Sequence, residues 1–162
     1  MNSENETYTI LKEISFALLA EGKTIRAKAD GYSMYPFIRP GSSVLLGAVN
    51  DDVTLIPGEI IAWKRESGFV LHRLIAIIKN GNETHYITRG DSSLQEDPPL
   101  SRDQVAGRVI MIEDKNGKTR EGSQLIKKPC YFYNRFVVWT LFQWRRILRP
   151  WLRIYKLDER KS

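Results

Sequence analysis

Short apolar segments separated by turn residues constrain the fold of this chain more than any other feature of its sequence. No helix-length pattern lies between these segments, so connections through crossover helices are not expected. Glycine and proline mark the turns. The pattern therefore predicts a mainly β domain with a coiled, antiparallel sheet. The expected strands are TIRAKA (24–29), SVLLGAV (43–49), the second half of LIPGEIIAWKR (55–65), GFVLHRLIAIIK (68–79), THYITRG (84–90) and QVAGRVIMIED (104–114).

Helical patterns occur at the two ends of the chain. Residues 7–20 predict a short amphipathic helix that ends before Gly22. The last part of the chain predicts a second amphipathic helix, rich in basic and aromatic residues. We therefore divide the chain into an N-terminal helix (1–22), a β-domain (23–125) and a basic aromatic C-terminal helix (126–162).

The C-terminal segment carries much of the positive charge of a chain whose formal net charge is +6. At helical spacing its arginines and its large apolar residues fall on opposite faces, which is typical of a helix that lies in a membrane interface. The alternative is a terminal helix packed on the β-domain with solvated arginines. Nucleic acid is a weaker expectation, because base stacking requires aromatic and basic residues in one groove. The predicted contacts with an anionic membrane are Trp144, Arg145, Arg146, Arg149 and Trp151.

Other sequence signals limit the location of the protein. The N-terminus lacks the basic region and cleavage box of a secretory signal, and no stretch has the roughly twenty apolar residues of a membrane span. The single cysteine, Cys130, excludes an internal disulfide. We therefore expect peripheral attachment to a membrane, on its cytoplasmic face.

The segment GYSMYPFIRPG (31–41) places Ser33 in a turn with two prolines. Pro36 fixes its own φ and removes a donor, which favours a rigid turn that presents one hydroxyl. A serine hydroxyl is a poor nucleophile until a base accepts its proton. Of the two histidines, His72 lies within an apolar strand, while His85 follows a turn among polar neighbours. His72 is therefore the better candidate base, although a histidine satisfied by a backbone carbonyl is an alternative.

Three segments together resemble the catalytic boxes of the type I signal peptidases and their relatives, the self-cleaving repressors. Ser33-Met34-Tyr35-Pro36 resembles the Ser-Met-x-Pro box, and Gly58-Glu59-Ile60-Ile61 resembles the Gly-Asp-Ile-Val strand. His72-Arg73, later in that second segment, resembles the His-Arg pair of the archaeal and endoplasmic-reticulum members. In the third segment, Gly90-Asp91 resembles their Gly-Asp box. The match covers roughly residues 25–114.

The resemblance implies the signal peptidase fold and a serine endopeptidase that cleaves a signal- or leader-like peptide bound as an extended strand. Ser33 would be the nucleophile and His72 the general base, with Asp97 orienting the imidazole and Asp91 as second choice. Gly31, Met34 and Pro36 would support the turn and the oxyanion site. We expect no metal and no cofactor.

Two alternatives follow from departures from the family. The chain lacks the N-terminal anchor of classical signal peptidases, and Gly31 stands where some bacterial relatives carry an oxyanion-binding hydroxyl. It also lacks room for the DNA-binding domain of the repressors. A catalytically inactive, membrane-peripheral peptide-binding module and a self-processing regulator are therefore the competing interpretations.

Overall fold

The computed structural model describes residues 3–50, 53–65, 68–81 and 83–127, together with residues 136, 139, 140, 143 and 144. Side chains are described from residue 10 onward within these ranges. The chain divides into two compact units, residues 1–129 and 130–162. The fold and the candidate site described below belong to the first unit.

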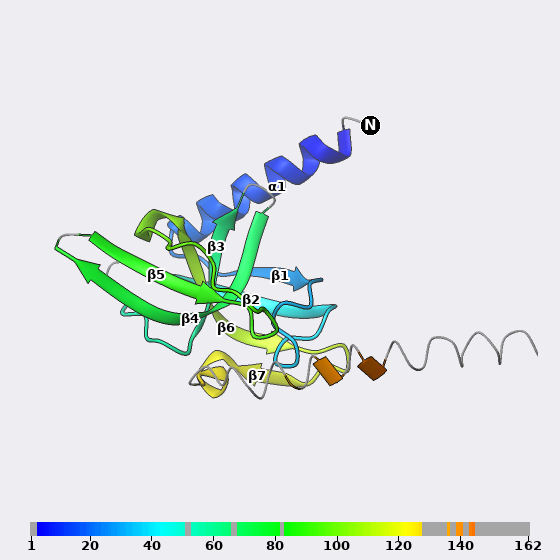
Figure 1. Ribbon diagram of the computed structural model, residues 1–162. Coiled ribbons are helices and arrows are strands. Elements are labelled where there is room, and N and C mark those ends of the chain that lie inside the picture. The colour runs from blue at the N-terminus through cyan, green and yellow to red at the C-terminus, as the bar shows by residue number, and fades with distance from the viewer. Residues whose placement is uncertain are drawn as a thin grey trace, which may run out of the picture. The chain divides into compact units, whose positions relative to one another are not determined.

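One antiparallel sheet forms the body of the first unit (Figure 1), and this confirms the predicted β fold. The order of its strands is β1-β2-β6-β3-β4-β5, and β7 pairs with β6 beside this path. β4 and β5 form a long hairpin that extends away from the other strands (Figure 1). The strands are β1 (Ile25–Ala29), β2 (Ser42–Ala48), β3 (Ile60–Arg65), β4 (Gly68–Asn80), β5 (Glu83–Arg89), β6 (Val105–Glu113) and β7 (Thr119–Glu121).

The sheet coils around a core that strands far apart in its order help to cover. Ala27 and Ala29 of β1 pack against the main apolar cluster, and so do Phe69 and Leu71 of β4. These two strands are separated by three others in the sheet order, so the sheet must curve for both to reach one core. A smaller cluster around Ile61 and Leu74 lies on the opposite face of β3 and β4.

Helix α1 (Ser3–Ala20) ends against the sheet in the way that its sequence predicts. Gly22 has a φ of 82°, and the N–H groups of Gly22 and Lys23 donate to the carbonyls of Leu19 and Leu18. This is a Schellman motif, which requires the left-handed residue that glycine supplies. Leu19 is buried, whereas Ile10 and Ile14, on the face that the periodicity singled out, are half exposed. The contact with the sheet is therefore made by the C-terminal part of α1, and the rest leads away from it (Figure 1).

Three short elements were not predicted from the sequence. The turn after β6 reverses the chain at Gly117, and β7 then pairs with residues 111–113. Two single-turn 3₁₀ helices, η1 (Arg102–Gln104) and η2 (Gly122–Leu125), flank this part of the sheet. None of these elements is long enough to show a hydrophobic period, and β7 depends on pairing with β6.

Most of the C-terminal segment falls outside the described residues. Arg145, Arg146, Arg149, Trp151 and Cys130 lie there, and so does most of the predicted C-terminal helix. Trp144 is helical, and 64% of its surface is exposed. Within the described ranges, no helix combines the length and the apolar character that a membrane crossing requires.

Candidate functional site

Ser33 lies in a compact turn between β1 and β2. Its neighbour Met34 is buried in the main core cluster, and the turn is closed by the N–H groups of Tyr35 and Ile38 donating to Tyr32 and Met34. Pro36 lies inside this turn and follows a cis peptide bond. The turn is thus anchored to the core by Met34 and held by its own hydrogen bonds, while Ser33 remains partly accessible to solvent.

His72 is on β4, directly opposite Ile61 of β3, and only 8% of its surface is exposed. Its ring packs edge-on against the indole of Trp63, with 6.5 Å between the ring centroids. The other histidine, His85, lies far along the hairpin, where its Nε2 is 3.4 Å from a carboxylate oxygen of Glu83. Of the two, only His72 is near the serine turn.

The carboxylate of Asp97 lies behind the imidazole of His72. The distance from His72 Nδ1 to Asp97 Oδ2 is 2.5 Å. The same oxygen accepts a hydrogen bond from the hydroxyl of Thr88 at 2.6 Å. With Nδ1 engaged by the carboxylate, the neutral ring carries its proton there and leaves Nε2 as the acceptor. The arrangement fixes both the orientation and the tautomer that a general base requires.

Gly90 separates His72 Nε2 from the serine turn. A β-carbon on Gly90 would lie 3.0 Å from His72 Nε2, 2.8 Å from the carbonyl oxygen of Ser33 and 2.5 Å from the hydroxyl of Ser93. The imidazole and the backbone of Ser33 therefore meet at the same point, and only a residue without a side chain leaves that point open. Among the described residues, no hydrogen bond yet joins the Ser33 hydroxyl to the ring, and such bonds are often loose before substrate binds.

The loop after β5 also holds the serine turn directly. Ser92 donates its backbone N–H to the carbonyl of Ser33 at 2.9 Å and its hydroxyl to the carbonyl of Tyr32 at 2.8 Å. Because one residue fixes two consecutive carbonyls, the turn cannot rotate independently of the loop. The loop that carries Gly90 and Asp97 thus sets the position of Ser33 relative to His72.

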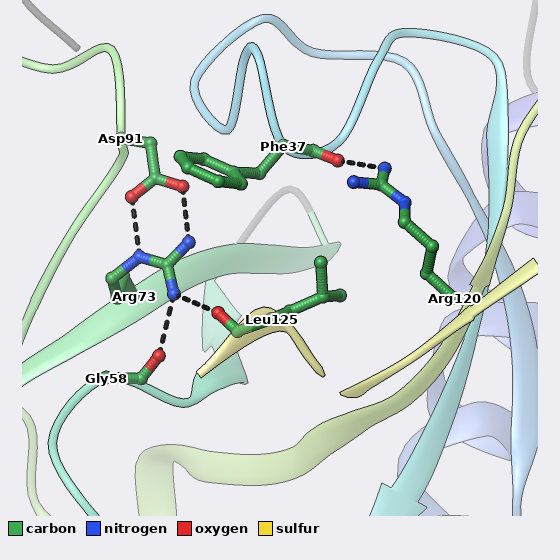
Figure 2. Close-up of polar contacts among 6 residues, drawn as sticks. All are labelled: Phe37, Gly58, Arg73, Asp91, Arg120 and Leu125. Carbon is green, nitrogen blue, oxygen red and sulfur yellow. Dashed lines mark hydrogen bonds and ion pairs between the residues drawn. The ribbon is translucent and has the colours of Figure 1, made fainter. Parts of the chain in front are cut away.

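Asp91 has a different partner from Asp97. It forms a two-pronged ion pair with Arg73, with Nε to Oδ1 and Nη2 to Oδ2 both at 2.7 Å (Figure 2). The remaining nitrogen, Nη1, donates to the carbonyls of Gly58 and Leu125, each at 2.7 Å. Both charged side chains are almost completely buried. Of the two candidate carboxylates, the structure therefore brings Asp97 to His72. It pairs Asp91 with Arg73, the residue that follows His72 in β4.

This ion pair reaches the serine turn through Phe37. The guanidinium carbon of Arg73 is 5.1 Å from the centre of the Phe37 ring, which lies over it (Figure 2). Arg120 of β7 donates to the carbonyl of Phe37 at 2.5 Å from the other side. Arg73 and Arg120 together fix the end of the turn that follows Ser33.

Gly31 differs from the other glycines of the site. Nothing lies within 4 Å of the position that its β-carbon would occupy, and its φ is outside the left-handed region. No conformational requirement therefore explains a glycine here. The residue leaves an open space two positions before Ser33, and a hydroxyl there would be accommodated.

One hollow of the described surface lies away from these residues. A cavity of about 430 Å³ opens between β6, β3 and η2, with Ile60, Arg108 and Leu125 in its wall. None of Ser33, His72 and Asp97 lines it. Ser33 and His72 lie instead next to strand edges that pair with no other described strand.

The roles of three residues in this arrangement were not predicted from the sequence. Thr88, Gly90 and Ser92 contact Asp97, His72 and the serine turn, respectively. Gly90 was recognised only as part of a box, and its role as a gap depends on a contact with residues far away in the chain. Thr88 and Ser92 look like ordinary strand and loop residues, and no local signal distinguishes them.

Comparison with known proteins gives a partial match. No protein-family model matches the chain. Over 86 residues the chain is 30% identical to signal peptidase I W of Bacillus subtilis (strain 168). The matched region covers 52% of this chain and 45% of that protein, so the chain spans less than half the length of the curated relative. The closer affinity to histidine-type members stays a prediction. For the matched half of the chain, this similarity supports a signal peptidase-like relationship.

Proposed function

We propose that this protein is a serine endopeptidase of the signal peptidase type, with Ser33 as nucleophile, His72 as general base and Asp97 as the group that orients the base. The observation that carries the proposal is the approach of His72 Nδ1 to Asp97 at 2.5 Å, while Nε2 faces the carbonyl of Ser33 across the gap at Gly90. These three groups come from three separate parts of the chain, and their convergence has no evident purpose in packing alone.

The proposed reaction follows from this arrangement. Ser33 Oγ attacks the carbonyl carbon of the scissile bond as His72 Nε2 takes the hydroxyl proton. Asp97 stabilises the imidazolium, and the N–H of Ser33 is a donor for the oxyanion. The imidazolium then gives its proton to the leaving amine, and an acyl-enzyme remains. A water molecule, activated by the same nitrogen, attacks the ester and releases the acid product and the free serine.

The free edges of the sheet support an extended peptide as substrate. β1 pairs only with β2, so its other edge is open among the described strands. The first residues of β4, up to His72, pair with β3 on one side, whereas pairing with β5 begins at Arg73. An added strand could use the backbone groups of either edge. Both edges lead to the site, because β1 runs into the serine turn and the open part of β4 ends at His72.

The test is cleavage of a synthetic peptide with an apolar stretch followed by small residues, with products identified by mass spectrometry. Ser33→Ala and His72→Ala should each lower kcat by about 10³-fold or more. Ser123→Ala and His85→Ala are matched controls away from the site and should leave cleavage unchanged. If Ser33→Ala cleaves as fast as the wild type, the assignment of the nucleophile is wrong. Binding of the peptide without cleavage by the wild type would favour the inactive peptide-binding module.

We further propose that the C-terminal segment attaches the protein to an anionic membrane surface. The exposure of Phe136, Trp139 and Trp144, at 63%, 58% and 64%, supports an interfacial role for the aromatic residues. Co-sedimentation with vesicles that contain anionic lipid should detect binding, and replacement of Trp144 by Ala should weaken it. Binding to DNA with a steep salt dependence, and none to vesicles, would overturn this proposal.

A further inference from the structure

The side chains of Thr88 and His72 both contact the Asp97 carboxylate. The side chain of Thr88 is completely buried, and its hydroxyl lies 2.6 Å from Asp97 Oδ2, the oxygen that also faces His72. We propose that Thr88 is a positioning residue that holds the Asp97 carboxylate against the imidazole. This inference rests on the proposed function, and it concerns a residue to which neither the sequence boxes nor the similarity to signal peptidases assigns a role.

The backbone of Thr88 also holds Asp97. Its carbonyl oxygen accepts the N–H of Asp97 at 2.8 Å, and Tyr86, two residues earlier in β5, exchanges two backbone hydrogen bonds with Leu100. The segment from Asp97 to Leu100 thus runs beside β5, joined to it by an isolated antiparallel bridge between Tyr86 and Leu100. The backbone contact sets where Asp97 stands, and the hydroxyl contact sets how its carboxylate is turned.

The hydroxyl contact matters because the Asp97 carboxylate could otherwise rotate toward water. About 18% of the Asp97 side chain is exposed, so water can reach it. A carboxylate with one protein partner can rotate toward solvent, whereas one with two donors on the same oxygen is held. The χ2 angle of aspartate has a broad distribution, so a second donor considerably narrows the range of angles that the carboxylate adopts. Loss of the Thr88 donor would therefore loosen the ring of His72 without moving the backbone.

Replacement of Thr88 tests this role in the full chain. Thr88→Val keeps the shape and the β-branched side chain but removes the donor, and Thr88→Ser keeps the donor. We expect Thr88→Val to lower kcat by about 10- to 100-fold with little change in KM, since small misplacements at a reacting centre cost this much. Thr88→Ser should stay within about threefold of the wild type. Thr88→Cys carries a weak donor, so its kcat should lie between those of the valine and serine variants. It replaces Thr88→Val in the test if the valine variant fails to fold.

A double substitution separates positioning from general support of the fold. In an Asp97→Ala background, Thr88→Val should have almost no further effect on kcat, because its route to His72 is already lost. Equal effects of Thr88→Val in both backgrounds would overturn the proposal. The proposal would also be overturned if Thr88→Ser lowered kcat as much as Thr88→Val does.

A measurement without substrate distinguishes a failure of this inference from a failure of the proposed function. In the wild type, the Nδ1 proton of His72 should give a slowly exchanging, far-downfield proton resonance, assigned by its loss in His72→Ala. That resonance should broaden or vanish in Thr88→Val and persist in Thr88→Ser. If the wild type cleaves no peptide but the resonance behaves in this way, the peptidase proposal fails and the role of Thr88 stands. A resonance unchanged in Thr88→Val would refute that role.

Discussion

The buried pair of Arg73 and Asp91 leads to the sharpest prediction about this molecule. The side chains of Arg73 and Asp91 are only 2% and 4% exposed, and the guanidinium makes four hydrogen bonds. Asp91→Asn keeps the shape but replaces two accepting oxygens by one oxygen and one NH₂ group. That NH₂ group faces an N–H of Arg73, so a buried charge remains without its counter-ion.

The expected magnitude follows from the burial. Removal of one partner from a buried ion pair typically costs about 3–5 kcal/mol of the free energy of unfolding. For a chain of this size, each kcal/mol corresponds to about 2–4 °C, so the melting temperature should fall by about 10 °C. Asp30→Asn is the matched control, because its pair with Lys28 is exposed at 70% and 75% and spans 4.0 Å. That variant should lose no more than about 0.5 kcal/mol.

A comparison with Asp97→Asn makes the test decisive between the two carboxylates. Asp97 faces His72 and is partly exposed, so its variant should lose about 10³-fold or more in kcat while unfolding within a few degrees of the wild type. Asp91→Asn should show the reverse, a large loss of stability and most of its activity kept at low temperature. Thermal unfolding by circular dichroism and peptide cleavage measure the two quantities. If Asp91→Asn has the melting temperature of the wild type and loses activity instead, the assignment of Asp91 to stability and of Asp97 to catalysis is wrong.

Two further predictions concern the site itself. Gly90→Ala should lower kcat by about 100-fold or more in the cleavage assay, since its methyl group would fill the gap between His72 Nε2 and the backbone of Ser33, and normal activity would contradict that geometry. Gly31→Ser should raise kcat by several-fold to about 100-fold, because the open space there admits a second oxyanion donor, and a loss of activity would count against it.

Several features of the fold could be predicted from local sequence. The strands were expected where β1 to β6 occur, because short segments with apolar residues are separated there by turn residues. Gly22 marked the end of α1, since only a residue that tolerates the left-handed region completes its cap. Ser33 and His72 were singled out for similar reasons, one by the prolines around it and the other by its place in an apolar strand. Their catalytic roles stay predictions.

Partnerships between distant residues could not be predicted in this way. The sequence left Asp91 and Asp97 as alternatives for the group behind His72. The coiling of the sheet and the path of the loop after β5 placed one against the imidazole and the other against Arg73. The contacts of Thr88 and Ser92 and the gap at Gly90 arise in the same way.

Residue type and spacing thus determined which segments become strands, where turns fall and which side chains have suitable chemistry. These properties depend on conformational preferences over a few neighbouring residues. Which carboxylate meets which base was decided only by the tertiary structure. That choice depends on how the sheet closes around its core, and the energy of closure is a sum over contacts between residues far apart in the chain.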